Sequence, residues 1–188
     1  MAELVAQRVP IRGEAGMGYV LEAGYDMPPL MLTHDELEAA ALGAAWVARR
    51  GDPSLARGAR DLIAKITQSI PAPLRPILLD VGLKPLSFKP VAAESFNVSE
   101  LRGAIRDRHK VAISYEDADQ RSSTRTIWPI FIGYTEEVRV IAAWCEWRRD
   151  FRHFRTDRIR SLQVMEERYP ERTAVLRKRW VASHTPKP

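Results

Sequence analysis

The chain has 188 residues, a net charge of +5, and hydrophobic and charged fractions of 45% and 28%, so it can fold as a globular protein with one substantial core. Its single cysteine, Cys145, excludes a disulfide framework and a zinc site of paired cysteines. With no secretory leader and no apolar run near the roughly 18 residues of a membrane span, we expect a cytoplasmic protein.

The positive charge is unevenly distributed. Residues 1–100 contain ten basic and twelve acidic residues, whereas residues 101–188 contain nineteen and twelve. Sixteen of those nineteen are arginines, whose guanidinium groups bind phosphates through paired hydrogen bonds. A genome rich in G and C also enriches arginine, but the distribution favours an anionic partner for the second half.

Residues 1–30 are predicted to form a hairpin followed by an extended connector. Gly13, Gly16 and Gly18 lie between short apolar ends, a hairpin pattern because glycine adopts the positive φ of tight turns. A phosphate-binding loop is rejected because no strand–loop–helix context and no Gly-Lys-Ser/Thr sequence follow. Paired prolines keep the connector extended.

Residues 31–71 are predicted to form a helical hairpin. Thr33 and Glu36 have the spacing of a capping box before the first helix, and Asp52, followed by a proline, begins the second. The second helix has an apolar stripe over residues 55–70, which is either core or a dimer face.

Residues 72–98 are a predicted Pro-rich linker, and residues 99–182 form a second folding unit. That unit begins with a short helix, continues with five short strands and ends with a basic helix. Such strands favour a small, strongly bent β-barrel of the SH3 or Sm type. Pro129 has no N–H to donate, so it must lie at a strand edge or a bulge. The predicted fold class is therefore α+β.

The most informative run is residues 139–159, in which arginines are interleaved with tryptophans and phenylalanines. Guanidinium groups bind phosphates, and aromatic faces stack on unpaired bases. The pattern favours an anionic ligand that carries rings, with single-stranded nucleic acid the first candidate. The alternative is a strand whose apolar side is core and whose arginines are merely solvated.

Several blocks match one bacterial family in order and spacing. They are residues 24–32 (a linker), 101–105 and 113–115 (a helix and the first barrel strand), 125–129 (an Arg-x-x-x-Pro strand) and 143–159 (the most diagnostic block). In these blocks the chain resembles the WYL-domain transcriptional regulators. The resemblance implies an N-terminal winged helix-turn-helix and a C-terminal Sm-like barrel that senses a ligand.

The chain departs from that family in two places. The tripeptide that names the family falls on residues 139–141, which read Arg-Val-Ile, so a pocket that uses its tyrosine would be altered or degenerate. Only ten residues precede the wing-like hairpin, too few for a recognition helix. We expect a truncated regulator, a misassigned start or a free-standing sensor, and only weak, non-specific binding of duplex DNA.

The candidate ligand site combines the arginines that would contact phosphates with the rings that would stack on bases. Its members are Tyr115, Arg125, Trp144, Arg148, Phe151, Arg152 and Arg155. For Arg125 a buried ion pair with Asp157 is an equal alternative, and for Tyr115 core packing is one. The resemblance suggests that Asp157 and Arg158 form a structural pair.

An enzyme is not expected, because the chain has no glycine-flanked serine, no HExxH and no Cys/His dyad at suggestive spacing. We expect no cofactor and no metal site, since the acidic turn at residues 116–119 is typical of solvated carboxylates. The predicted function is ligand sensing by a regulator. The alternative is a structural module that forms a homodimer and carries a vestigial ligand face.

Overall fold

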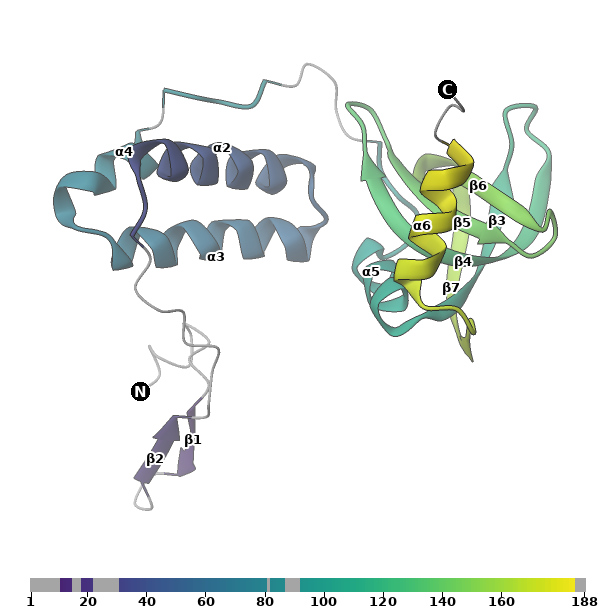
Figure 1. Cartoon of the computed structure of the whole chain (residues 1–188), viewed down its shortest axis with the longest axis horizontal. Coiled ribbons are helices and arrows are strands. Elements are labelled where there is room, and N and C mark those ends of the chain that lie inside the picture. The colour runs from purple at the N-terminus through teal and green to yellow at the C-terminus, as the bar shows by residue number, and fades with distance from the viewer. Residues whose placement is uncertain (1–10, 15–17, 22–30, 81, 87–91, 185–188) are drawn as a thin grey trace.

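The computed structural model describes residues 11–14, 18–21, 31–80, 82–86 and 92–184, and the statements below concern these ranges (Figure 1). Near the N-terminus, β1 (Ile11–Glu14) and β2 (Gly18–Leu21) pair antiparallel, as in the predicted hairpin. Most of the predicted extended connector lies outside the described residues. No helix within the described ranges is long and apolar enough to cross a bilayer.

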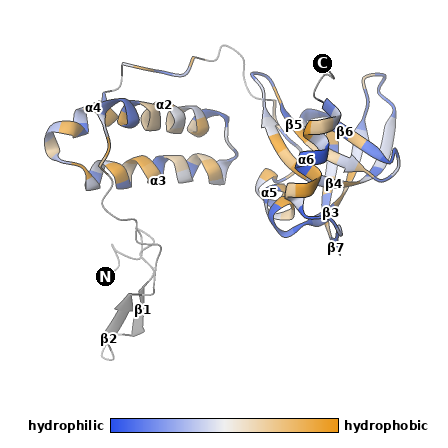
Figure 2. Cartoon of the chain, viewed as in Figure 1, coloured by the Kyte–Doolittle hydropathy of each residue, from blue (hydrophilic) through white to orange (hydrophobic). Residues whose placement is uncertain are grey.

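A helical hairpin follows, formed by α2 (His34–Arg50) and α3 (Pro53–Ser69). Both predicted helix starts are confirmed, because a capping box precedes α2 and the Asp52 carboxylate accepts the first N–H groups of α3. Figure 2 shows the hydrophobic residues of both helices, of which Leu37, Ala41 and Ile66 are buried in the hairpin core together with Ile70, directly after α3. The stripe of the second helix thus contributes to core, although Leu62 remains 46% exposed.

The predicted Pro-rich linker is helical at its start. A 3-10 turn, η1 (Ala72–Leu74), runs into α4 (Arg75–Leu79), from which Leu78 packs into the hairpin core. The prolines permit this because they occupy the first turn of each helix, where the missing N–H has no intrahelical partner. The structured part, which we name the helical unit, therefore extends from α2 through α4.

The C-terminal half forms an antiparallel sheet flanked by helices, which we name the sheet domain. Its elements are α5 (Val98–Asp107), β3 (His109–Glu116), β4 (Ser122–Tyr134), β5 (Arg139–Cys145), β6 (Asp150–Arg155), η2 (Thr156–Arg158), β7 (Ile159–Arg168) and α6 (Thr173–His184). The five predicted strands are present, in the spatial order β6-β5-β4-β3-β7, and the α+β class is confirmed. Because β6 and β7 are edges of this sheet, it bends without closing, and the expected barrel remains open (Figure 1).

The two faces of the sheet are buried against different helices. The inner face, as we name it, packs against α5. Its core contains Leu101, Ala104, Val111, Ile113, Ile127, Ile141, Ala143, Cys145, Phe154 and Ile159. The outer face lies beneath α6, which crosses it in Figure 1. Its buried residues are Ile130, Phe151, Tyr169 and Leu176. Cys145 is fully buried within this inner core.

Pro129 lies at a bulge in β4, as predicted. The register between β4 and β5 shifts between Pro129 and Phe131, since a proline cannot donate to the ladder. The Tyr169 hydroxyl donates to the Pro129 carbonyl oxygen at 3.0 Å. The bulge contributes Ile130 and Phe131 to the cluster beneath α6.

The helical unit and the sheet domain meet at a polar joint. Four polar or charged residues are buried in the described ranges, and all of them lie at this contact: Arg50, Asp52, Arg139 and Thr156. The Arg139 guanidinium donates to the Arg50 carbonyl oxygen and to the Glu94 carboxylate. On the other side of the contact, Arg102 forms an ion pair with Asp52. We refer to these contacts together as the joint.

Candidate functional site

An exposed tryptophan with two guanidinium groups over its ring lies beyond the end of β5. Trp147 is 62% exposed, and the Cζ of Arg125 lies 4.0 Å from its ring centroid. The Cζ of Arg148 lies 5.3 Å from the same ring. Both distances are within the range of cation–π attraction. These three residues, which we name the Trp147 cluster, combine a flat apolar surface with two positive charges.

The alternation of β4 places Arg125 in this cluster. Ile127 is fully buried on the inner face, and Arg125, two residues earlier, lies on the same face opposite Ile113. Arg125 is half-buried, and its Nε donates to the Ser123 hydroxyl at 3.0 Å. Its guanidinium is therefore held in one orientation at the edge of the inner core.

A tight turn between β5 and β6 presents Trp147 to solvent. Arg149 in this turn has a φ of 49°, in the left-handed region that few residues with side chains adopt. The chain thereby reverses direction within the four residues between the two strands. Trp147 belongs to neither strand, so the alternation that buries Cys145 does not apply to it.

Tyr115 is partly committed to packing. Its ring meets the ring of the buried Phe154 edge to face, with centroids 5.1 Å apart. It remains half-buried at the end of β3, packed against the inner core. The geometry thus supports the core-packing interpretation for one side of this ring.

Arg152 and Arg155 each have a carboxylate partner two residues away in the sequence. Arg152 forms an ion pair with Asp150 at 3.2 Å, and Arg155 forms one with Asp157 at 2.8 Å. The guanidinium of Arg155 holds the pKa of the Asp157 carboxyl below its ordinary value through a hydrogen bond. The arginine side chains are 51% and 41% exposed, so solvent screens both pairs and they stabilise the fold only weakly.

Two predicted ion pairs are corrected by this arrangement. Asp157 pairs with Arg155 rather than with Arg125 or Arg158. The reason is local, because Arg155 and Asp157 lie on either side of a single residue as β6 runs into η2. Arg125 is occupied instead by Ser123 and by the Trp147 ring.

Phe151 and Trp144 do not lie with the Trp147 cluster, and the predicted stacking role of Phe151 is corrected. Phe151 is 7% exposed beneath α6, so its ring is inaccessible to a base. Trp144 is half-buried on the same outer face, in edge contact with Phe151 at 5.2 Å, and Arg179 of α6 lies over it. Phe154, on the opposite face of β6, is buried in the inner core.

The segment that contains this cluster matches a known family. A family model described as the WYL domain matches residues 97–164. These residues form a WYL domain. The matched segment begins at the Asn97 cap of α5 and ends within β7, so it includes Tyr115 and the whole Trp147 cluster.

One solved structure is also similar to the chain, that of Proteasome accessory factor B/C (PafBC) of Arthrobacter aurescens. The two are 18% identical in sequence, with a TM-score of 0.40 over 90% of this chain. The chain spans 24% of the length of that protein.

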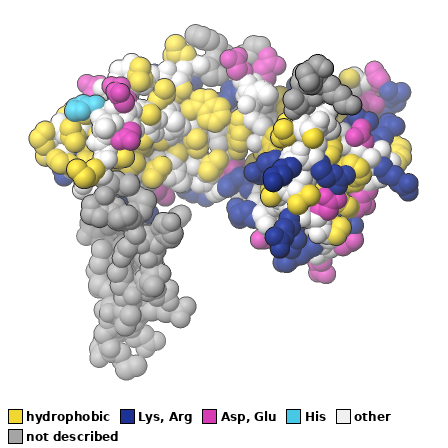
Figure 3. Space-filling model, in the orientation of Figure 1, with side chains coloured by type: hydrophobic (Ala, Val, Ile, Leu, Met, Phe, Trp, Pro, Cys, Tyr) yellow, Lys and Arg dark blue, Asp and Glu magenta, His cyan; other side chains and the backbone are white. Residues whose placement is uncertain are grey.

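The WYL domain is also the basic part of the chain. In Figure 3, the dark blue Lys and Arg side chains gather over the sheet domain, whereas the visible face of the helical unit is mainly yellow. Within the described residues, no three His, Cys, Asp or Glu side chains gather to hold a metal ion.

Trp147 is the functional candidate that sequence reasoning left out of the predicted site. It stands in the Trp-Cys-Glu-Trp-Arg-Arg run that attracted attention to this segment. Its position in the sequence could have indicated this role, because Trp147 follows the last apolar residue of β5 and so belongs to neither buried face of the strand.

Proposed function

We propose that the chain is the ligand-sensing part of a WYL-domain transcriptional regulator, and that its ligand is an anion derived from nucleic acid. The observation that carries the proposal is the Trp147 cluster, an exposed indole with guanidinium groups 4.0 and 5.3 Å from its ring. A base that stacks on Trp147 brings its phosphates within reach of Arg125 and Arg148.

Arg152, Arg155 and Tyr115 have secondary roles in this proposal. A phosphate that approaches the arginines exchanges the weak pairs with Asp150 and Asp157 for charge-assisted hydrogen bonds. Tyr115 offers the exposed part of its ring at the edge of the same inner face. The ligand preference follows from the exposed ring, because stacking requires a base that is not already paired.

Fluorescence anisotropy with short single-stranded oligonucleotides at two or more salt concentrations tests the proposal. We expect Trp147→Ala to weaken binding by about 1–3 kcal/mol, the usual contribution of a stacked base. Arg125→Ala should weaken binding and reduce the slope of log K against log salt by about 0.7, the value for one phosphate contact on a single strand. Arg177→Ala, an exposed arginine on α6, is the matched control and should retain the affinity of the wild type.

Two results contradict the proposal. One is binding that does not weaken as salt is added. The other is an affinity that Arg177→Ala reduces as much as Trp147→Ala does, because the contact would then be a general attraction to the basic surface.

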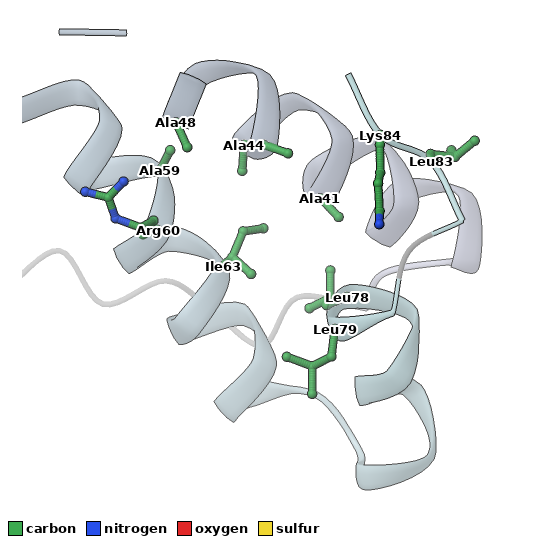
Figure 4. Close-up of a pocket in the computed structure, with 11 residues that line it drawn as sticks. Ala41, Ala44, Ala48, Ala59, Arg60, Ile63, Leu78, Leu79, Leu83 and Lys84 are labelled. Carbon is green, nitrogen blue, oxygen red and sulfur yellow. The ribbon is translucent and has the colours of Figure 1, made fainter. Parts of the chain in front are cut away.

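A second candidate function, a homodimerising module with a vestigial ligand face, is favoured by the exposed apolar residues of the helical unit. A cavity of about 360 Å³ opens between α2, α3 and α4, where small alanines leave space beside Ile63 (Figure 4). Several leucines around and beyond it are exposed: Leu62, Leu79, Leu83 and Leu86. Apolar surface of this kind is typical of a protein–protein contact, here with a second copy of the chain.

Sedimentation at micromolar concentration tests the second candidate. We expect a dimer that Leu79→Glu dissociates, because Leu79 is 72% exposed beside the cavity. Val175→Glu on α6 is the control, since Val175 is also exposed but lies on the sheet domain. A strict monomer for the wild type excludes dimerisation.

A further inference from the structure

A second cavity, separate from the Trp147 cluster, lies at the joint. Its volume is about 690 Å³, within the range of small-molecule sites. It is lined by the α2–α3 turn and the start of α3 on one side, and by residues 94–99 and Arg139 on the other. Arg139 begins β5 and Trp147 follows its end, so the seven strand residues separate the two places by roughly 20 Å.

The two carboxylates that line this cavity are already neutralised. Asp52 accepts hydrogen bonds from Arg102 at 2.9 and 3.1 Å, and it also caps the N–H groups at the start of α3. Glu94 accepts from the Arg139 guanidinium, and the Thr156 hydroxyl lies 3.1 Å from the same carboxylate oxygen. The acids of the cavity are thus committed to partners within the protein.

Cationic donors remain in the cavity. Arg139 is 5% exposed, yet its Nε has no hydrogen-bond partner in the described ranges. A buried guanidinium N–H without an acceptor is costly, so the position favours a ligand that supplies one. Arg57, an exposed residue of α3, lines the same cavity and adds a positive charge that Asp52 and Glu94 do not balance.

Two helices also begin at this cavity. Pro53 at the start of α3 and Val98 at the start of α5 both line it, and the N-terminal end of a helix carries a partial positive charge. The side chains of Asp52 and Asn97 cap these ends. The helix ends therefore contribute to the positive potential, while Arg57 and Arg139 supply the direct donors.

We propose that this cavity binds a small molecule with an oxyanion group, a phosphate or a carboxylate, held between Arg57 and Arg139. The ligand would connect α3 of the helical unit to β5 of the WYL domain, across the contact that the joint already makes. This site does not depend on the ligand proposed for the Trp147 cluster.

Thermal unfolding in increasing sodium phosphate, with sodium chloride at matched ionic strength as the reference, tests this site. We expect a saturable rise in Tm for the wild type, because a ligand that binds only the folded state stabilises it. Arg57→Ala, an exposed change that should leave folding intact, should raise the Kd for phosphate about tenfold, or about 1.4 kcal/mol. Arg60→Ala, an exposed residue of the same helix that lines the other cavity, should bind phosphate as the wild type does.

Sodium acetate in place of phosphate distinguishes the two ligand chemistries. Tighter binding of phosphate indicates a phosphorylated ligand, and tighter binding of acetate indicates a carboxylate. The proposal is overturned if neither anion gives a saturable rise in Tm beyond that of chloride. It is also overturned if Arg57→Ala and Arg60→Ala bind the anion equally well, because the effect would then be general salt stabilisation.

Discussion

Replacement of Arg139 by methionine should destabilise the protein by about 3–5 kcal/mol, the cost of removing one partner of a buried ion pair. The side chains of Arg139 and Glu94 are 6% and 11% exposed, so solvent screens this pair little. The change leaves the Glu94 carboxylate with the Thr156 hydroxyl as its remaining partner at the joint. It also removes the donor to the Arg50 carbonyl oxygen, at the end of α2.

Thermal or urea unfolding, followed by circular dichroism, measures this effect. For a chain of this length, each kcal/mol lowers Tm by about 2–4 °C, so a loss of roughly 6–20 °C is expected for Arg139→Met. Glu94→Gln should cost less, about 1–2 kcal/mol, because the amide oxygen still accepts from Arg139 while the charge is lost.

The double variant Glu94→Gln with Arg139→Met provides the decisive comparison. Removal of both partners leaves no unpaired buried charge, so the double variant should lose less stability than the two single changes together, by about 0.5–3 kcal/mol. Additive losses, or an Arg139→Met protein within about 1 kcal/mol of the wild type, would refute the assignment of a buried ion pair at the joint.

Three further predictions concern the sheet domain and its binding of nucleic acid. Trp180 donates a hydrogen bond to His153 Nε2 at 3.2 Å, and burial together with the nearby His184 lowers the pKa of His153. The stability of the fold should therefore fall as the pH drops below about 6.5, where the unfolded chain takes up a proton more readily than the folded one. Thermal melts across that pH range should show this dependence in the wild type and not in His153→Gln. Phe151→Ala should lower the free energy of unfolding in urea by about 3–5 kcal/mol but leave the affinity for oligonucleotides unchanged, whereas Trp147→Ala should lower the affinity and not the stability. Loss of affinity in a folded Phe151→Ala protein would show that this ring belongs to the ligand site. In gel shifts, duplex DNA should bind weakly and without sequence preference, and a discrete complex that resists competitor DNA would contradict this prediction.

The features that could be predicted from the sequence are those set by nearby residues. Thr33 and Glu36 form a capping box because the two residues that interact are three apart. Pro129 marks a bulge because the missing N–H is a property of that residue alone. The prolines of the predicted linker were misleading for the same local reason, since a proline in the first turn begins a helix as readily as it interrupts one.

The candidate site was only partly predictable, because burial depends on segments far apart in the chain. Phe151 and Trp147 are both aromatic residues beside arginines, and nothing nearby distinguishes them. Phe151 is buried because Leu176 of α6, twenty-five residues later, packs in the same cluster. Trp147 is exposed because it lies in the turn after β5 and packs in neither the inner core nor the cluster beneath α6.

The altered family tripeptide has a structural consequence that the sequence did not indicate. Residues 139–141 read Arg-Val-Ile, so an altered or degenerate pocket was expected if the family's tyrosine contributes to ligand binding. Arg139, the first of them, donates instead to Glu94 and to the end of α2, so it belongs to the joint. The Trp147 cluster is built at the opposite end of β5 by residues outside the tripeptide. Arg139 therefore helps to attach the WYL domain to the helical unit, and the arginine–tryptophan surface lies outside the tripeptide.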